Sequence, residues 1–444
     1  MNREILSASD IRIMKELFEE RVKEYFGEDS SGFLELLKQP CTQGFFLNTR
    51  KMNREKILDL IDFPYRINDY SSDSFYHDEE NIGKTRAYEL GLIYPQEIAA
   101  SLTTKHIEKE NVSVVVDLCA APGGKSINVL NRLPEDVLCI SNDMNHSRCL
   151  AMAQNLERLG LDNTIVTNMK CDQLAQQLEE SADIVILDAP CSGEGMIRKY
   201  PEILDSYSLE SIKKLSALQK ELLENACRIL KKGGQLIYST CTYAYEEDEN
   251  QIEDFLSRHA DMRMVPLGQK GSSRLEGTVK LSPLNGTEGQ FYCIMKKDGK
   301  QEAKHLKELK TAQNRLVEDF IRDNLIIDTY YLYLLHDQFY LSLKPMPDLK
   351  KNVIRYGVCL GEIKGKRFEP NHSLYRANSL IGKYRYSYEL NDEEYDRFVS
   401  GQEIFSSLDS HYYLLTYKGA SIGFGKCSNG IIKNKYPKGL RRML

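Results

Sequence analysis

Residues 112–126 read VSVVVDLCAAPGGKS, an apolar run that leads into a glycine-rich turn. The β-branched stretch Val112–Leu118 predicts a buried strand. Gly123 and Gly124 allow the backbone to approach a ligand closely. The helix predicted over Lys125–Arg132 directs free N–H groups and a positive dipole end at the same turn. This order of strand, glycine turn and helix predicts a ligand-binding unit.

The chain after this stretch alternates between short apolar strands and amphipathic helices. Strands are predicted over Val137–Asn142, Thr164–Met169, Asp183–Asp188, Gln235–Thr240 and Gln290–Lys296, and helices over His146–Leu159, Leu209–Lys231 and Glu247–His259. Nearly continuous apolar strands that alternate with helices are typical of a parallel sheet covered on both faces. We therefore expect an α/β fold whose ligand crevice lies at the carboxyl ends of the strands.

A smaller region precedes this core. Residues 9–27 have the apolar periodicity of an amphipathic helix, Phe45–Asn48 predicts a strand, and a helix is expected after Asn53. Residues 62–86 are polar and rich in Tyr, Ser and Asp, so we expect them to be irregular. The first 100 residues are therefore predicted to form a mixed α/β module.

A charged stretch after Lys296 predicts a domain boundary, and residues 302–323 have a helical pattern. Short strands are predicted beyond it, over Tyr330–Leu335, Phe339–Leu343, Val353–Leu360 and Tyr412–Tyr417. The resulting division is an N-terminal module over 1–100, a core domain over 101–298 and a strand-rich C-terminal region over 299–444.

The composition limits the class of protein. Of the 444 residues, 41% are hydrophobic and 28% are charged, as in ordinary globular chains. No apolar run approaches the ~18 residues of a spanning helix, and the charged N-terminus does not resemble a signal peptide. The eleven cysteines lack CxxC spacing, which predicts reduced thiols in a cytoplasmic protein and no metal site. We expect no membrane partner and a monomer.

The charge is unevenly distributed along the chain. The formal net charge of −6 argues mildly against a nucleic-acid partner. Residues 411–444, however, contain seven Lys and Arg and no Asp or Glu. This basic end could contact phosphates, although a solvated tail remains the alternative. Tyrosines in the same region could stack on bases, but tyrosines in short strands more often belong to a core.

Acidic residues follow the next two predicted strands. Asp143 lies twenty residues after Gly123, the offset at which an acid binds ribose hydroxyls in nucleotide-binding units. Asp172 follows the strand after that. These positions favour a glycine turn that binds a nucleoside-containing ligand over a glycine turn that binds no ligand.

A nucleoside triphosphatase is the competing interpretation. Gly124-Lys125-Ser126 ends like a phosphate-binding P-loop, and Ile184–Asp188 resembles the metal-binding strand of such proteins. The P-loop pattern requires glycine where this chain has Cys119, and Pro122 removes a backbone donor. This alternative is therefore disfavoured.

Two cysteines follow two further strands. Cys191 comes three residues after Asp188, and Cys241 follows Tyr238-Ser-Thr. Parallel strand ends face one crevice, so we expect both thiols to converge with Asp188 near the glycine turn. A thiolate is a strong nucleophile, which suggests group transfer by covalent catalysis. The alternative, a small buried hydrophobe, is accepted for Cys139, Cys149 and Cys227.

These motifs together resemble those of a known family. DLCAAPGGKS (117–126), DAPCSGEGMIRK (188–199) and YSTCTYAYEEDEN (238–250) look like motifs of the Sun-family RNA 5-methylcytosine methyltransferases, in the family's order. GLIYPQEIAAS (91–101) resembles the family's Gln-containing lead-in. FEPNHSLY (368–375) and KNKYPKGLRR (433–442) resemble the PUA-like, RNA-binding end of the bacterial RsmF branch. Departures are small: Ile197 replaces a phenylalanine, and Asp143 replaces a glutamate.

The resemblance implies a Rossmann-like domain that uses S-adenosylmethionine to methylate cytosine C5, with small-subunit rRNA as the partner. It implies that Cys241 attacks C6, that Asp188 bonds the base near N3, and that Cys191 assists loss of the C5 proton and release. Lys125 would lie near cofactor and base. The acidic run Glu246–Glu249 is expected to be a solvated helix start without a chemical role.

The same resemblance implies which residues bind the cofactor and the RNA. The implied cofactor-binding residues are Cys119, Ala120, Ala121, Pro122, Gly123, Gly124, Lys125, Asp143, Arg148, Asp172 and Asp188. The implied RNA-binding residues are Lys426, Lys433, Lys435, Lys438, Arg441 and Arg442. Truncation after residue 297 is expected to preserve cofactor binding and weaken RNA binding. Methylation of tRNA, or a noncatalytic RNA-binding factor in ribosome assembly, remains an alternative.

Overall fold

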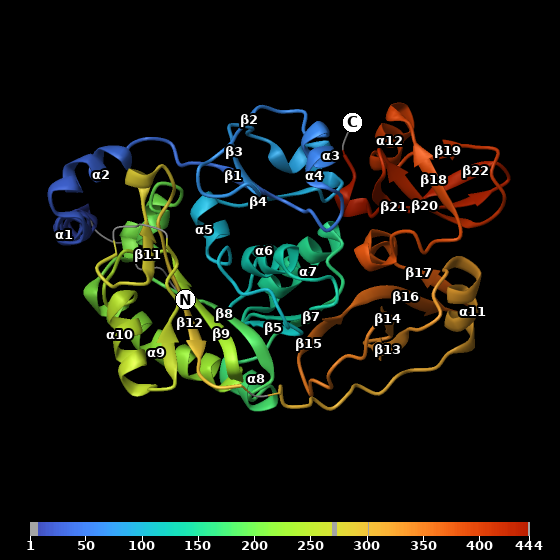
Figure 1. Ribbon diagram of the computed structural model, residues 1–444. Helices are drawn as coiled ribbons and strands as arrows, with labels where there is room; N and C mark the ends of the chain where they lie inside the picture. Colours follow the sequence, from blue (N-terminus) through green and yellow to red (C-terminus); the bar gives the residue numbers. More distant parts are fainter. Residues whose placement is uncertain (1–7, 269–272, 301, 443–444) are drawn as a thin grey trace.

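The structure is a computed structural model that describes residues 8–268, 273–300 and 302–442. Its centre is a parallel sheet in which neighbouring strands follow the order β7 (Thr164–Thr167), β6 (Leu138–Asn142), β5 (Val114–Asp117), β8 (Ala182–Asp188) and β9 (Leu230–Thr240). The winding direction reverses between β5 and β8, and open α/β sheets bind ligands at such switch points. The predicted Rossmann-like fold is confirmed (Figure 1).

Antiparallel strands extend both edges of this sheet. Beyond β9 lie β12 (Gln290–Lys297), β10 (Met262–Met264) and β11 (Thr278–Leu281). At the opposite edge, β15 (Val353–Tyr356) pairs with β7. The C-terminal region therefore contributes a strand to the central sheet.

Helices cover both faces of the sheet. One face packs against α6 (Gly124–Arg132) and α7 (His146–Leu159), and the other against α8 (Cys171–Gln177), α9 (Leu209–Ile229) and α10 (Glu249–Arg258). The bounds of α7 are those that its periodicity predicts. The side chain of Asn145 caps this helix by accepting the N–H of Arg148.

The N-terminal module packs above α6 and α7 in the view of Figure 1. Its sheet contains β2 (Tyr65–Arg66), β3 (Ser74–His77), β1 (Gly44–Leu47) and β4 (Ile93–Pro95), in that order, with helices α1 (Ala8–Phe26), α2 (Ser30–Leu36), α3 (Arg54–Asp59), α4 (Arg86–Glu89) and α5 (Ile98–Leu102). The expectation of irregular structure over 62–86 is wrong for β2 and β3. Phe75 of β3 stacks on Phe45 of β1, with ring centroids 5.5 Å apart, so the strand is stabilised by a distant partner.

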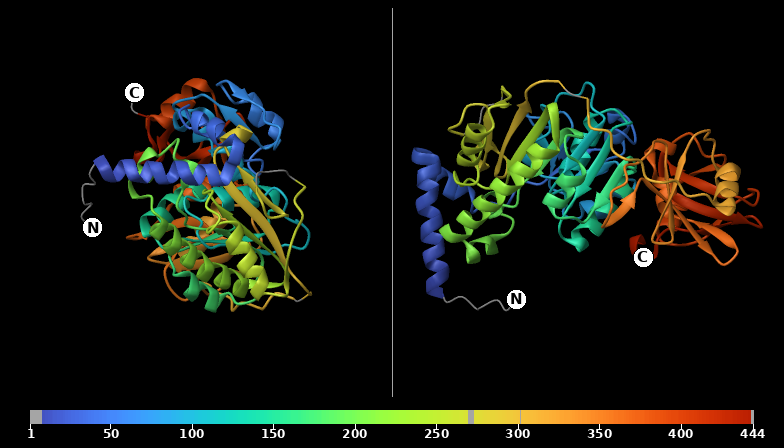
Figure 2. Two further views of the ribbon diagram at one scale, coloured as in Figure 1. Left: turned by 90° about the vertical axis from the view of Figure 1, so that its left-hand side faces the viewer. Right: turned by 90° about the horizontal axis from the view of Figure 1, so that it is seen from below.

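Two small sheets form the C-terminal region. The first contains β13 (Tyr331–Leu335), β14 (Gln338–Ser342), β16 (Val358–Lys364) and β17 (Arg367–Pro370); the second contains β18 (Ser387–Leu390), β20 (Tyr412–Tyr417), β21 (Ala420–Ser428), β22 (Ile431–Asn434) and β19 (Ile404–Phe405). Helices α11 (Arg315–Asn324) and α12 (Asp392–Val399) accompany them. Figure 2 places these sheets at one end of the molecule and α1 at the other.

Two further predictions for this region are wrong. The helix expected over 302–323 is reduced to α11, because the preceding chain donates N–H groups to other segments, as Ala312 does to the carbonyl of Leu332. The strand expected over Val353–Leu360 is two strands in different sheets. Gly357 separates them with a φ of +58°, a conformation that glycine adopts without strain.

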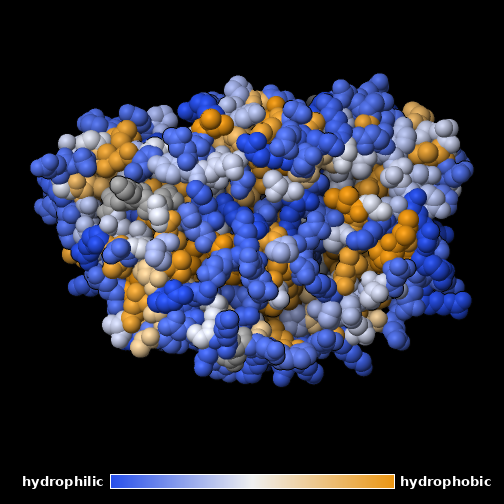
Figure 3. All heavy atoms as spheres, viewed as in Figure 1, coloured by the Kyte–Doolittle hydropathy of each residue, from blue (hydrophilic) through white to orange (hydrophobic). Residues whose placement is uncertain are grey.

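Among the described residues, no helix is long and apolar enough to cross a membrane. On the face shown in Figure 3, hydrophobic residues lie in small groups among hydrophilic ones.

Candidate active site

The glycine turn connects β5 to α6 at the switch point of the sheet. Gly123 has a φ of +108°, and α6 begins at the next residue. A Cβ at Gly124 would lie 2.9 Å from the amide nitrogen of Gln96. The carbonyl oxygen of that same side chain accepts a hydrogen bond from Asn128 of α6 at 2.8 Å. The segment 91–101, which contains Gln96, therefore packs directly against the glycine turn.

Asp117 ends β5 beneath this turn and is fully buried. One carboxylate oxygen accepts a hydrogen bond from Ser126 at 2.7 Å, and the other has no partner among the described residues. Burial raises the pKa of Asp117 to about 7. An unpartnered carboxylate oxygen at the base of a glycine turn is consistent with a ligand-binding role.

Asp143 lies at the end of the neighbouring strand, beside the turn. Its carboxylate accepts the N–H of Asn145 at 2.8 Å and lies 3.4 Å from Nη1 of Arg148. Arg148 also donates to the carbonyl of Ala121. The structure thus brings Asp143 and Arg148 against the turn, whereas Asp172 is exposed in the first turn of α8.

The remaining residues of the turn differ in burial. Ala120 and Ala121 are buried, Cys119 is half-buried, and Pro122 is exposed. The carbonyl of Pro122 accepts a hydrogen bond from Asn155 of α7 at 3.1 Å.

The two thiols meet at the ends of β8 and β9. The Sγ atoms of Cys191 and Cys241 lie 3.4 Å apart, and the backbone N–H of Cys241 donates to Sγ of Cys191 at the same distance. The Cys241 thiol and burial raise the pKa of Cys191 well above its usual value. The Cys191 thiol is therefore held protonated at neutral pH.

Asp188 joins the thiols to the glycine turn. Nζ of Lys125 lies 2.8 Å from Oδ2 of Asp188, and Ser239 donates to Oδ1 at 2.8 Å. The side chain of Asp188 is 36% exposed and that of Lys125 is 9% exposed. This ion pair therefore anchors a carboxylate that remains partly exposed at the end of β8.

A buried glutamate braces the two cysteine loops. Glu194 follows Cys191 and is fully buried. Its Oε2 accepts hydrogen bonds from the hydroxyl of Thr242 and the N–H of Tyr243, both at 2.9 Å. Tyr207 donates to Oε1. The loop that carries Cys191 is thus tied to the residues after Cys241.

Glu247 forms a second connection between these loops. Its Oε2 accepts the N–H of Ser192 at 3.0 Å and the side-chain amide of Gln219 at 2.8 Å. Burial raises the pKa of Glu247 to about 7. The prediction that Glu246–Glu249 is a solvated helix start is therefore wrong, because Glu247, Asp248 and Glu249 are fully buried.

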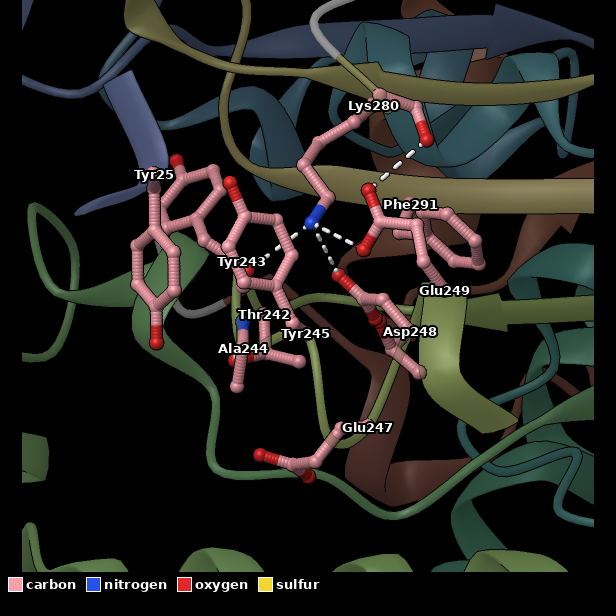
Figure 4. Close-up of polar contacts among 12 residues, drawn as sticks. Tyr25, Thr242, Tyr243, Ala244, Tyr245, Glu247, Asp248, Glu249, Lys280 and Phe291 are labelled. Atoms are coloured by element: carbon pink, nitrogen blue, oxygen red, sulfur yellow. Dashed lines mark hydrogen bonds and ion pairs between the residues drawn. The ribbon is translucent and has the colours of Figure 1, made fainter. Parts of the chain in front are cut away.

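Lys280 of β11 forms ion pairs with Asp248 and Glu249 (Figure 4). Its Nζ lies 3.0 Å from Asp248 and 2.8 Å from Glu249, and donates to the carbonyl of Tyr243 at 2.9 Å. Burial lowers the pKa of Lys280, but Asp248 and Glu249 outweigh burial and raise it. The loop after Cys241 is therefore anchored to the antiparallel edge of the sheet.

The sequence patterns predicted no role for Glu194, Glu247 or Lys280. Glu194 lies inside the motif around Cys191, and Glu247 lies inside the motif around Cys241. The acidic residue inside each motif was the sequence feature that could have indicated these structural roles. Lys280 lies outside all three motifs, so only the folded structure identifies it.

The six C-terminal cations that the resemblance assigns to RNA binding have three different environments. Arg442 pairs with Glu89 at 2.6 Å, and Arg441 donates to the carbonyl of Tyr436. Lys438 is exposed. The others, Lys426, Lys433 and Lys435, line a cleft beside α7. Among the described residues, no group of three or more His, Cys, Asp or Glu is arranged to hold a metal.

Four family models match successive parts of the chain. They describe the N-terminal domain of 16S rRNA methyltransferase RsmF (residues 14–98), 16S rRNA methyltransferase RsmB/F (104–296), the RsmF rRNA methyltransferase first C-terminal domain (316–377) and the methyltransferase RsmF PUA domain (385–442). The chain belongs to the RsmB/F methyltransferase family. The matches to N-terminal, first C-terminal and PUA domains place it with the RsmF members.

Individual relatives support this placement in the family. "Ribosomal RNA small subunit methyltransferase F" of Aliivibrio fischeri is 26% identical over 458 residues, which cover 96% of each protein. Among solved structures, a methyltransferase homologue protein from Pyrococcus horikoshii has a TM-score of 0.57 and 27% identity, and covers 66% of this chain and 100% of its own. NSun6 from the same organism, solved with SFG, has a TM-score of 0.57 at 21% identity, covers 64% of this chain and 98% of its own, and shows the common fold.

Proposed function

We propose that this family member transfers a methyl group from S-adenosylmethionine to C5 of a cytosine in small-subunit rRNA, through a covalent bond between Cys241 and C6. The separation of 3.4 Å between the two Sγ atoms at the carboxyl ends of β8 and β9 carries this proposal. The ion pair of Lys125 and Asp188 and the glycine turn lie at the same edge of the sheet. The small-subunit rRNA substrate rests on the names of full-length relatives.

The residues around the turn fit the cofactor. When bound, S-adenosylmethionine supplies an electrophilic methyl group. The turn over residues 119–125 would hold it, with the free N–H groups of the first turn of α6 as donors. Asp143 and Arg148 would bind on one side and Asp172 at the rim, and Asp117 offers its unpartnered oxygen below.

The two thiols have different surroundings, because in the described part of the chain only Sγ of Cys191 accepts the backbone N–H of its partner, and this supports different roles. The raised pKa of Cys191 disfavours Cys191 as the attacking thiolate, and the resemblance to the family assigns the attack to Cys241. Its Sγ forms a bond to C6, which makes C5 nucleophilic toward the methyl group. After transfer, solvent water takes the C5 proton, the electron pair of the C5–H bond forms the C5–C6 double bond, and the bond from Sγ to C6 breaks with its electron pair returning to Cys241 as the thiolate. Cys191 assists these last steps, and Asp188 bonds the base near N3.

The target base must be accessible from outside a duplex. C5 and C6 are covered in stacked pairs, so the base is single-stranded or extruded, at a cost of roughly a few kcal/mol. The region 101–298 would perform the chemistry. The regions 1–100 and 299–444 would hold the RNA, the latter with Lys426, Lys433, Lys435, Lys438, Arg441 and Arg442.

Single cysteine variants test the covalent mechanism. Cys241→Ala is expected to lower the methylation rate by at least ~10³-fold and to form no crosslink to RNA, because the nucleophile is absent. Cys191→Ala is expected to accumulate a denaturation-resistant complex with RNA when cofactor is present. Tritium transfer to small-subunit rRNA and to tRNA, followed by a denaturing gel, measures both effects.

Cys41→Ala, at a half-buried cysteine of the N-terminal module, is the matched control and should behave as the unmodified chain. Methylation near the normal rate in both Cys241→Ala and Cys191→Ala would overturn the covalent mechanism. Transfer to tRNA but not to rRNA would overturn the substrate assignment. No transfer by the unmodified chain would favour a noncatalytic factor.

A further inference from the structure

A large cleft lies outside the crevice of the two thiols. Its volume is about 1110 Å³. The lining comes from α7, from residues between 367 and 376, and from strands β20, β21 and β22, with α4 at one side. The cleft exists only where the N-terminal module, the central domain and both C-terminal sheets meet.

The rim of this cleft carries cations without counter-ions. Arg367, Lys433 and Lys435 are exposed, and none of them forms an ion pair within the part of the chain that the structure describes. Nζ of Lys426 lies 5.0 Å from the centre of the Tyr412 ring. Four positive side chains are therefore free to contact an anionic ligand.

Buried cations lie beneath the rim. Arg376 is 2% exposed and its Nε has no hydrogen-bond partner among the described residues. Arg158 leaves Nε and Nη2 unpartnered, and His372 leaves Nδ1 unpartnered. Burial lowers the pKa values of Arg158, Arg376 and His372, and the neighbouring cations lower that of His372 further, so the positive charge beneath the rim comes from the two arginines. Positive charge that is crowded and poorly solvated favours an anion in the space above it.

The acids on the lining do not cancel this charge. Glu89 is engaged by Arg442 at 2.6 Å and by the hydroxyl of Tyr395 at 2.7 Å. Glu369 pairs with Lys364 at 3.2 Å. Burial raises the pKa of Glu157, which disfavours its charged form. The uncompensated charge of the cleft is therefore positive.

We propose that this cleft binds the phosphodiester backbone of single-stranded RNA, as a second contact apart from the crevice that holds the target base. The inference rests on the proposed function, because that function makes RNA the substrate. The exposed rim cations contact phosphates, and the buried cations strengthen the field that attracts them. Asn155 lines the cleft and also donates to Pro122 of the glycine turn. A strand of RNA bound in the cleft would lie beside α7, whose Asn155 connects the cleft to the glycine turn.

Matched charge variants test this inference. Arg367→Gln with Lys433→Gln removes two exposed rim cations. Lys366→Gln with Lys418→Gln removes two exposed cations of the same region that do not line the cleft. Binding of a fluorescent oligocytidylate is measured by anisotropy between about 50 and 200 mM salt. The rim variant should bind about tenfold more weakly, and its logarithmic salt slope should fall by about 1.4, since each phosphate contact contributes about 0.7.

The control variant should bind as the unmodified chain does, and both variants should keep its melting temperature. The rim variant should also raise KM for rRNA and leave kcat unchanged. Equal affinity of rim and control variants would overturn the cleft assignment, even if rRNA is methylated. A selective loss in the rim variant would support the cleft, even if the unmodified chain failed to methylate rRNA, an outcome that would overturn the proposed function alone.

Discussion

Lys51 is a lysine in the protein interior. Its side chain is buried, and Nζ has no hydrogen-bond partner among the described residues. Burial, with Arg376 and Arg158 nearby, lowers the pKa of Lys51 well below its usual value. Lys51→Met keeps a similar volume and removes the amine. We expect it to stabilise the fold by about 1–3 kcal/mol, the cost of an unpaired buried donor.

The stabilisation by Lys51→Met should depend on pH. The unfolded chain binds a proton at Lys51 up to its ordinary pKa of about 10.4, whereas the folded chain releases it at lower pH. The penalty of the native lysine is therefore large at pH 7 and shrinks as pH approaches 10. Thermal unfolding at both pH values measures the difference. Lys56→Met, at an exposed lysine of α3, should change stability by about 0.5 kcal/mol or less. A lower melting temperature in Lys51→Met would contradict this account.

The loop between β9 and α10 is the element on which the reactive thiol depends. It begins at Cys241 and returns through Asp248, which accepts a hydrogen bond from Thr240 at 2.5 Å. Lys280 holds the loop from β11, and Glu194 holds it from the loop of Cys191. The position of Cys241 is therefore set by side chains from two other segments.

Lys280→Met should destabilise the protein by about 3–5 kcal/mol, because two buried carboxylates lose their cation. Lys296→Met provides a matched control on β12. Lys296 pairs with Glu108 at 2.5 Å, but the two side chains are 23% and 52% exposed. Loss of such a pair should cost about 1 kcal/mol or less. Urea unfolding compares the two variants, and equal losses would show that the buried triad does not anchor the loop.

At the scale of the whole molecule, the C-terminal region is part of two other cores. β15 pairs with β7, and the side chains of Leu349, Val353 and Tyr356 pack in the core of the central domain. The second C-terminal sheet shares a core with the N-terminal module, where Leu415 and Phe45 belong to one cluster. The N-terminal module and the C-terminal region are thus connected through packing as well as through the ion pair of Arg442 and Glu89.

Truncation after residue 297 should therefore weaken cofactor binding, contrary to the expectation from sequence. It removes β15, exposes the edge of β7 and uncovers apolar core residues, which favours unfolding and aggregation. Truncation after residue 384 retains β15 and should lower the melting temperature less. Calorimetric titration with S-adenosylmethionine and thermal unfolding compare both with the full chain. If the 297-residue chain kept the full affinity for S-adenosylmethionine and an unchanged melting temperature, the expectation from sequence that the C-terminal region is not needed for cofactor binding would hold.

The sequence by itself determined the α/β core and the convergence of the thiols. Strand and helix periodicity, the N-cap at Asn145 and the glycine turn are local properties, so they can be predicted from a few neighbouring residues. The same patterns predict that the residues after β8 and β9 lie close together, because parallel strands present their carboxyl ends to one crevice. The roles of Cys241 and Cys191 came from a resemblance, since position alone does not separate two adjacent thiols.

Only the tertiary structure decided the environment of the charges. An acidic run is the same in sequence whether water or Lys280 lies opposite, so the burial of Glu247, Asp248 and Glu249 was not predictable from it. The pairing of β15 with β7 joins segments far apart in the chain and leaves no local signal. The basic C-terminal residues likewise divide between an ion pair with Glu89 and the rim of the cleft, because folding places only some of them beside a carboxylate.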